Sequence, residues 1–149
     1  MRIVVVACSA GKAAGTRQAQ ELYTSDLFRK SSTLAKQMVA NGQGDAWFIL
    51  SAKHGLLEPT QVIEPYDVKL DDLTKAQYAA WKRRVMRQMP GPLSLLPFSD
   101  WADSVVALCG ATYREVLADY CDDIGSALEA PMAGLGIGQQ KAWLIKQVA

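Results

Sequence analysis

The sequence predicts a small α/β domain, built on an open, mainly parallel sheet with helices on both faces. Three near-continuous apolar runs support this prediction, at residues 2–8, 46–52 and 105–110. A strand that is covered on both faces shows such a run instead of an alternation of apolar and polar residues. Helical patterns separate the runs, as in strand–helix–strand units. We find no repeat or linker in the 149 residues and therefore expect one domain over residues 1–149.

The first strand, residues 2–8, is followed by helical sequence that Asn41 and Gly42 terminate. One face of this helix is apolar, and it consists of Leu27, Phe28, Leu34, Ala35, Met38 and Val39. The second strand covers residues 46–52. Pro59 and Pro65 interrupt the segment 55–73, which predicts a long loop across the edge of the sheet where ligands bind.

The next helix begins at a capping box formed by Thr74 and Gln77 and ends before Pro90. Its core stripe contains Tyr78, Trp81, Val85 and Met89, and its outer face carries Lys82, Arg83, Arg84 and Arg87. The third strand covers residues 105–110. Thr112 and Glu115 predict a second capping box, with a helix that continues to about Tyr120.

Three glycines predict a turn into a last helix: Gly134, Gly136 and Gly138. They do not form a GxGxxG motif after a strand, so close packing of a turn explains them. One face of the last helix is expected to contain Ile137, the stem of Lys141, Leu144, Ile145 and Val148.

Composition narrows the class of protein. Hydrophobic residues make up 50% of the chain and charged residues 21%, which is ordinary for a globular domain. The net charge of +1 argues against a large cationic field and leaves room only for a local basic patch. Three cysteines without a close pair predict reduced thiols and a cytoplasmic protein, with no metal site and no cofactor. We expect no signal peptide and no membrane span.

Polar residues that follow the first two strands predict a ligand site at one edge of the sheet. Ser9, Gly11 and Lys12 have the chemistry of an anion cradle, in which backbone N–H groups and an ammonium hold a phosphate or carboxylate. Their spacing is shorter than that of a P-loop, which argues against ATP hydrolysis of that type. Cys8 is either a nucleophile near a helix start or a small buried residue that closes the strand. Lys53 adds a second cation at this edge.

The single histidine and the loop after it provide the candidate acid–base groups. His54 follows Lys53 at the end of the second strand, so we assign it either a catalytic or a structural role. In the loop, Pro65 stiffens the approach to Tyr66 and Asp67. A nucleobase can stack on the ring while the carboxylate activates water or stabilises an oxocarbenium-like transition state. The alternative is that Asp67 only forms a local turn.

The third strand and the basic helix add further candidates. Gly110 precedes a helix start, which favours a negative ligand group, and Arg114 adds positive charge nearby. An ordinary capped helix would explain this segment without a ligand. The basic face formed by Lys82, Arg83, Arg84 and Arg87 is either a solvated surface or a contact for nucleic-acid phosphates.

Several motifs together resemble a bacterial and phage family that is similar to the peroxide-stress protein YaaA. They are Cys8-Ser9-Ala10-Gly11-Lys12, residues 22–28 (LYTSDLF), residues 50–57 (LSAKHGLL), residues 65–67 (PYD) and residues 134–138 (GLGIG). The Cys-Ser-x-x-Lys element is also similar to one in the core domain of archaeosine synthase, which acts on a modified tRNA base. The resemblance implies a small α/β domain linked to base modification, base removal or DNA binding. It adds Tyr23 and Ser25 to the candidate substrate-binding residues.

The leading hypothesis is an enzyme that acts on a nucleobase, a nucleotide or a base within nucleic acid, by hydrolysis of an N-glycosidic bond or by base transfer. Its candidate catalytic residues are Asp67, His54 and Cys8. Its candidate substrate-binding residues are Ser9, Gly11, Lys12, Tyr23, Ser25, Lys53, Tyr66, Gly110 and Arg114. The expected partner is DNA rather than RNA, or a free nucleotide or base. The alternative is a non-catalytic module that binds nucleic acid or nucleotides. No residue supports a third interpretation, an accessory protein that acts through protein contacts.

Overall fold

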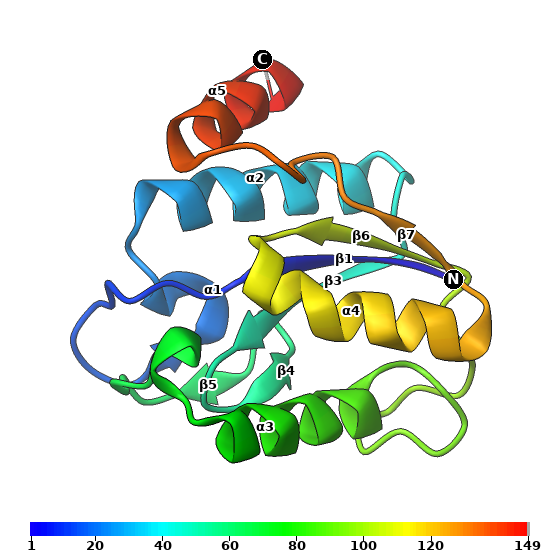
Figure 1. Cartoon of the computed structure of the whole chain (residues 1–149). Coiled ribbons are helices and arrows are strands. Elements are labelled where there is room, and N and C mark those ends of the chain that lie inside the picture. Colours follow the sequence, from blue (N-terminus) through cyan, green and yellow to red (C-terminus); the bar gives the residue numbers. More distant parts are fainter. Residues whose placement is uncertain (149) are drawn as a thin grey trace.

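The computed structural model describes residues 1–148 and confirms an α/β fold around an open, mainly parallel sheet (Figure 1). The expected domain boundary at residue 149 lies outside the described residues. The strand order of the main sheet is β4-β3-β1-β6-β7. Its strands are β1 (Arg2–Ala7), β3 (Ala46–Ser51), β4 (Gly55–Leu57), β6 (Ser104–Leu108) and β7 (Ala127–Glu129). Neighbouring strands are parallel except for β4, which pairs antiparallel with β3.

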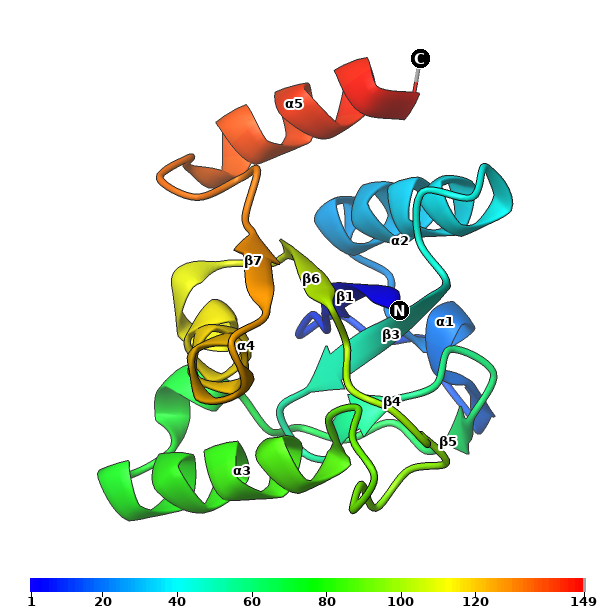
Figure 2. The ribbon, with the colours of Figure 1, turned by 90° about the vertical axis from the view of Figure 1, so that its right-hand side faces the viewer.

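Helices cover both faces of the sheet, as predicted (Figures 1 and 2). The helices α2 (Asp26–Ala40) and α5 (Ile137–Val148) lie on one side, and α3 (Lys75–Gln88) and α4 (Ala111–Ile124) lie on the other. The main contact of α5 is with α2, and Figure 2 shows α5 standing away from the sheet. Among the helices of residues 1–148, none combines the length and the apolar character that crossing a bilayer requires.

Strand β1 shows why the apolar runs contain no alternation. Ile3 and Val5 belong to the core beneath α3 and α4, whereas Val4 and Val6 belong to the core beneath α2. All four side chains are completely buried. Each face of this strand therefore has its own hydrophobic core, which is the burial that a central parallel strand requires.

The predicted loop over residues 55–73 is wrong in part, because it contains regular structure. Besides β4 it holds β5 (Val62–Ile63), which pairs antiparallel with β2 (Arg17–Gln18), and the 3-10 helix η1 (Leu70–Asp72). The short helix α1 (Ala19–Leu22) and strand β7 were also not predicted. These elements have two to four residues, too few for a hydrophobic period to be recognised.

Two predictions about the helices also need correction, although the Thr74–Gln77 capping box is confirmed. Thr112 is not a cap, because α4 begins at Ala111 with Gly110 as its N-cap, and the helix continues to Ile124. Glu115 instead accepts hydrogen bonds from groups on α3. In α5, Ile137 and Ile145 are 64% and 52% exposed, so they do not share the buried position of Leu144.

Candidate functional site

The candidate site lies at the carboxyl edge of the sheet, where β1 and β6 end side by side. The chain leaves β1 toward α2 on one face and leaves β6 toward α4 on the other face. In open α/β sheets, the crevice at such a switch point is where ligands bind. A small cavity of about 60 Å³ is found here. Its lining includes Cys8, Ser9, Ser25, Cys109, Gly110 and Gln140.

Two helices begin at this cavity. The Ser25 hydroxyl caps α2 by accepting a hydrogen bond from the Phe28 N–H at 3.1 Å. Gly110 precedes α4 and has no side chain with which to cap it. In the first turn of α4, Arg114 donates a hydrogen bond to the Cys109 carbonyl at 3.3 Å. The N-termini of α2 and α4 carry partial positive charge, which favours an anionic group of a ligand between them.

In the loop after β1, the residues of the expected anion cradle are separated, because Ser9 and Lys12 lie at different places. A Cβ atom added to Gly11 would lie 2.9 Å from Thr24 Oγ1, so the glycine permits a close approach of the two segments. The next residue, Lys12, forms a β-bridge with Tyr23. Its ammonium lies 4.4 Å from the centre of the Tyr66 ring. Ser9 therefore lines the cavity, whereas Lys12 is placed over Tyr66.

Tyr66 is the residue around which the other candidates gather. Its hydroxyl lies 2.6 Å from the Tyr23 hydroxyl and 2.6 Å from Ser51 Oγ. Ser51 is completely buried and ends β3. These two contacts join the loop that carries Tyr66 to Tyr23, just after α1, and to Ser51, at the end of β3. They place the Pro65–Tyr66–Asp67 segment at the same edge as Lys12 and Lys53.

The donors and acceptors of this hydroxyl cluster have a defined order. Ser51 Oγ accepts the backbone N–H groups of Lys53 and His54, at 3.2 and 3.1 Å. Because both lone pairs of the Ser51 oxygen are then used, its own proton is donated to Tyr66. Tyr66 in turn donates to Tyr23. Burial raises the pKa of Tyr66 above its ordinary value and that of Tyr23 to about 12, so both phenols keep their protons at neutral pH.

Positive charge surrounds the Tyr66 ring. Lys12 and Lys53 lie 4.4 and 5.9 Å from its centre, and the His54 ring makes an edge contact at 5.4 Å. Within residues 1–148, neither lysine forms an ion pair. Two cations held over an aromatic face without a carboxylate partner are able to bind a phosphate or carboxylate from outside.

Cys8 lines the small cavity and lies close to a tyrosine of α4. Its sulfur is 3.3 Å from the hydroxyl of Tyr113, which comes from the first turn of α4. Burial raises the pKa of Tyr113, and a negative charge on Cys8 would raise it further. The half-buried thiol thus has a hydroxyl partner and is inside the candidate site. By contrast, Cys109 is buried, and burial raises the pKa of its thiol to about 12.

Asp67 has a different environment from that of its neighbour Tyr66. Its side chain is exposed, and within residues 1–148 it makes no hydrogen bond or ion pair through its carboxylate. The segment that carries it is nevertheless fixed on both sides, by Tyr66 and by the buried Leu70 of η1. Asp67 is therefore an exposed carboxylate one residue along the chain from Tyr66, with no protein partner within residues 1–148.

Helix α3 holds the turn that carries Lys53 and His54. The Trp81 indole donates to the Ser51 carbonyl at 2.9 Å, and Arg84 donates to the Lys53 carbonyl at 3.0 Å. The Gln88 amide donates to the His54 carbonyl at 3.0 Å and accepts the Leu56 N–H at 2.8 Å. These three side chains recur at helical spacing on one face of α3. They fix the backbone of the turn on which two candidate ligand-binding side chains depend.

The pKa of His54 gives a direct test of this environment. Burial, and then the charges of Lys53 and Arg84, lower it below the ordinary value of 6.5. His54 is the only histidine, so we expect its single proton NMR titration to have a midpoint below 6.5. Lys53→Ala should move that midpoint upward, because it removes a positive neighbour. A wild-type midpoint at or above 6.5 would contradict the burial of the ring.

The same shift predicts how acid affects stability. The unfolded chain protonates His54 at about its ordinary pKa, whereas the folded chain does so only at lower pH. Between these two values the unfolded state binds more protons, so stability should fall as the pH drops through that window. Urea unfolding at several pH values would measure the effect, and His54→Gln should remove this contribution.

The basic face of α3 is only partly available for nucleic acid. Lys82 pairs with Glu115 at 3.0 Å and with Asp119 at 3.2 Å, and Arg84 is used by the Lys53 carbonyl. Arg83 and Arg87 remain, and they border an open groove between α3 and α4. The four residues therefore do not form one uncompensated patch.

Four residues that shape the site are absent from the candidates predicted from the sequence: Ser51, Trp81, Gln88 and Tyr113. Ser51 is the last residue of β3, and Tyr113 lies in the first turn of the helix that follows β6, positions that indicate a ligand edge. Trp81 and Gln88 carry no such signal, because their role depends on where α3 packs. Within residues 1–148, no group of three or more His, Cys, Asp or Glu side chains is arranged to hold a metal ion.

The fold and the crevice define an α/β protein with a candidate ligand site at the carboxyl edge of a mainly parallel sheet. The chain belongs to a family of unknown function, DUF6884, whose sequence model matches residues 3–146. No curated protein and no solved structure matched the chain.

Proposed function

We propose that this protein is an enzyme that binds a nucleotide, free or within DNA, at the carboxyl edge and hydrolyses its N-glycosidic bond. The observation that carries the proposal is the Tyr66 cluster. Two lysines without ion-pair partners and an imidazole surround the Tyr66 ring, which provides groups that can contact a base and a phosphate and accept a proton. Asp67, with its exposed carboxylate, is the next residue in the chain. The resemblance to the YaaA-like family supports a reaction on a base.

Each group has a chemical role in this reaction. Water attacks the sugar carbon as its bond to the base nitrogen breaks, and the departing base takes up a proton from solvent. Asp67 stabilises the positive charge that develops on the sugar. His54, whose pKa lies below 6.5, is neutral at pH 7 and able to accept a proton from the attacking water. Cys8 lines the cavity at the switch point. In base transfer its sulfur would bond to the sugar carbon as the outgoing base leaves with the thiol proton, and the incoming base would then displace the sulfur.

The first experiment is a screen for released bases. The full-length protein is incubated with the common nucleosides and nucleotides and with single- and double-stranded DNA, and free bases are detected by mass spectrometry. We expect a base to appear in a manner that depends on time and enzyme concentration. If none is released from any of these substrates although binding is measurable, the enzyme proposal fails.

A non-catalytic nucleotide-binding module is the second candidate. It is favoured by the exposure of Asp67, which leaves this carboxylate in contact with solvent. Binding to a nucleotide without release of its base would support this candidate over hydrolysis.

Lys12→Ala and Lys53→Ala should each weaken the binding of a phosphorylated nucleotide by about tenfold or more. A hydrogen bond to a charged group contributes roughly 1.5–3 kcal/mol. Calorimetric titration of each variant with a nucleoside monophosphate measures the loss, and the parent nucleoside is the matched ligand without the phosphate. The variants should bind the nucleoside almost as the wild type does. Equal losses for both ligands would show that the lysines do not recognise phosphate.

DNA and a free nucleotide are distinguished by salt and by the groove residues. Reversing the charge of Arg83 and Arg87 should weaken binding only if the ligand is a polymer that reaches this face, and the effect should diminish as salt is added. Binding that is insensitive to both changes would identify a small nucleotide as the ligand.

A further inference from the structure

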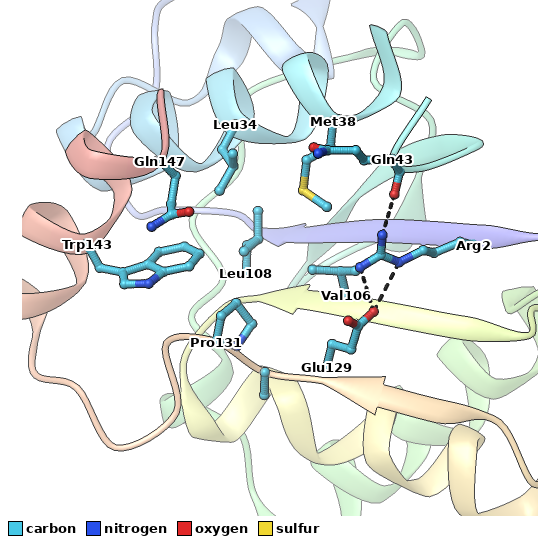
Figure 3. Close-up of a pocket in the computed structure, with 11 residues that line it drawn as sticks. Arg2, Leu34, Met38, Gln43, Val106, Leu108, Glu129, Pro131, Trp143 and Gln147 are labelled. Carbon is cyan, nitrogen blue, oxygen red and sulfur yellow. Dashed lines mark hydrogen bonds and ion pairs between the residues drawn. The ribbon is translucent and has the colours of Figure 1, made fainter. Parts of the chain in front are cut away.

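A second and larger cleft lies on the same face of the sheet, nearer the amino end of strand β6, between the sheet, α2 and α5 (Figure 3). It exists because α5 packs on α2 and does not cover the strands beneath it. Its volume is about 500 Å³, within the roughly 300–1,000 Å³ that is typical of small-molecule sites. The lining is apolar where α2 faces β6, and it consists of Leu34, Met38, Val106 and Leu108.

One end of this cleft contains a partly exposed ion pair between Arg2 and Glu129, in which each nitrogen of the Arg2 guanidinium already donates a hydrogen bond. Arg2 donates through Nε and Nη2 to a single oxygen of Glu129, at 3.0 and 2.7 Å, and through Nη1 to the Gln43 carbonyl at 2.6 Å (Figure 3). Within residues 1–148, the second carboxylate oxygen of Glu129 has no hydrogen-bond partner. This end therefore offers a strong acceptor and no free positive charge, which favours a ligand that donates hydrogen bonds over an anion.

The other end contains an aromatic wall. Figure 3 shows Trp143 of α5 and Pro131 at the end of the cleft away from Arg2, with the Gln147 amide above the indole. The indole is half-buried and is not paired with another aromatic ring within the described chain. A flat ring system would gain from contact with this face, and the aliphatic side chains opposite it would cover the other side of that ring.

We infer that this cleft binds a neutral planar heterocycle that carries hydrogen-bond donors on one edge, the chemical class of an aminopurine base. The ring lies between Trp143 and the aliphatic wall, and its donor edge faces Glu129. The cleft shares Leu108 with the cavity at the carboxyl edge but none of the residues around Tyr66, so it is a second site. The inference goes beyond the proposed function and does not require that any bond is cleaved.

The test is NMR detection of adenine binding by the full-length protein. The indole N–H signal of Trp143 is assigned by its loss in Trp143→Phe. Adenine should shift this signal at millimolar concentration and leave that of the distant Trp101 unchanged. Purine, which has the same rings without the amino group, should bind more weakly. Binding of octanoate in preference to adenine would overturn the inference, because it would identify an aliphatic ligand.

Matched variants locate the bound ring. Met38→Trp fills the cleft and should abolish the saturation transfer from protein to adenine, whereas Ile145→Trp adds the same ring on the exposed side of α5 and should not. Glu129→Gln keeps an oxygen for Arg2 and should weaken adenine binding by about tenfold. The inference is wrong if adenine leaves Trp143 unshifted in the wild type, or if Glu129→Gln binds adenine and purine equally well. If Met38→Trp does not fold, the comparison of adenine with purine in the wild-type protein still tests the inference.

Discussion

Asp67→Asn is expected to lower the rate of base release at least about a hundredfold while nucleotide binding remains near normal. The substitution keeps the shape of the side chain and removes the negative charge that stabilises the transition state. Because the Asp67 carboxylate makes no hydrogen bond or ion pair within residues 1–148, its loss should not disturb the fold. Single-turnover rates and a calorimetric titration, measured on the same preparation, separate the two effects.

Two other carboxylates of the same segment provide the controls. Asp71 is near enough to Tyr113 for its charge to raise the pKa of that phenol, so it is the rival carboxylate at the crevice. Asp72 is exposed beside it in η1. We expect Asp71→Asn and Asp72→Asn to retain most of the activity. If Asp71→Asn is inactive and Asp67→Asn is active, the catalytic role belongs to Asp71.

The fold could be predicted because its central strands are long and buried on both faces. In β1, the run from Ile3 to Val6 has no polar residue, and only a strand between two layers of helices produces such a run. The strands at the sheet edges are shorter: β4 is buried but has only three residues, and β7 is mostly exposed. In β7, Ala127 and Glu129 are exposed and Leu128 is only half-buried, so the sequence contains no pattern that marks this strand.

The sequence predicts which segments come together at the candidate site, but it does not predict which side chains contact each other there. The ends of β1 and β3 and the Pro65–Tyr66–Asp67 segment do meet at one edge, since parallel strands bring their carboxyl ends together. The hydrogen bonds that fix Ser51 and His54 come from α3, 30 or more residues further along the chain. Such contacts are set by helix packing, for which a single sequence has no local signal.

The position of the turn that carries Lys53 and His54 should depend on Gly55. We expect Gly55→Ala to lower the free energy of unfolding by about 3 kcal/mol. Gly55 has φ +74°, a left-handed conformation that costs other residues about 1–2 kcal/mol. A Cβ atom there would also lie 2.1 Å from the Gln88 amide oxygen. The amide must move away, and the hydrogen bonds to His54 and Leu56 that it provides are lost, which costs roughly a further 1–3 kcal/mol.

Gly125 offers a matched control, because its φ of +72° is nearly the same and no atom lies within 4 Å of the position of an added Cβ. Gly125→Ala should therefore show the conformational cost alone, about 1 kcal/mol. Urea unfolding of both variants measures the difference between them, which we assign to Gln88. In a double-mutant cycle, Gly55→Ala should cost less in a Gln88→Ala background than in the wild type, because the displaced amide is already absent. If Gly55→Ala and Gly125→Ala are equally destabilising, the Gln88 amide does not fix the turn that carries Lys53 and His54.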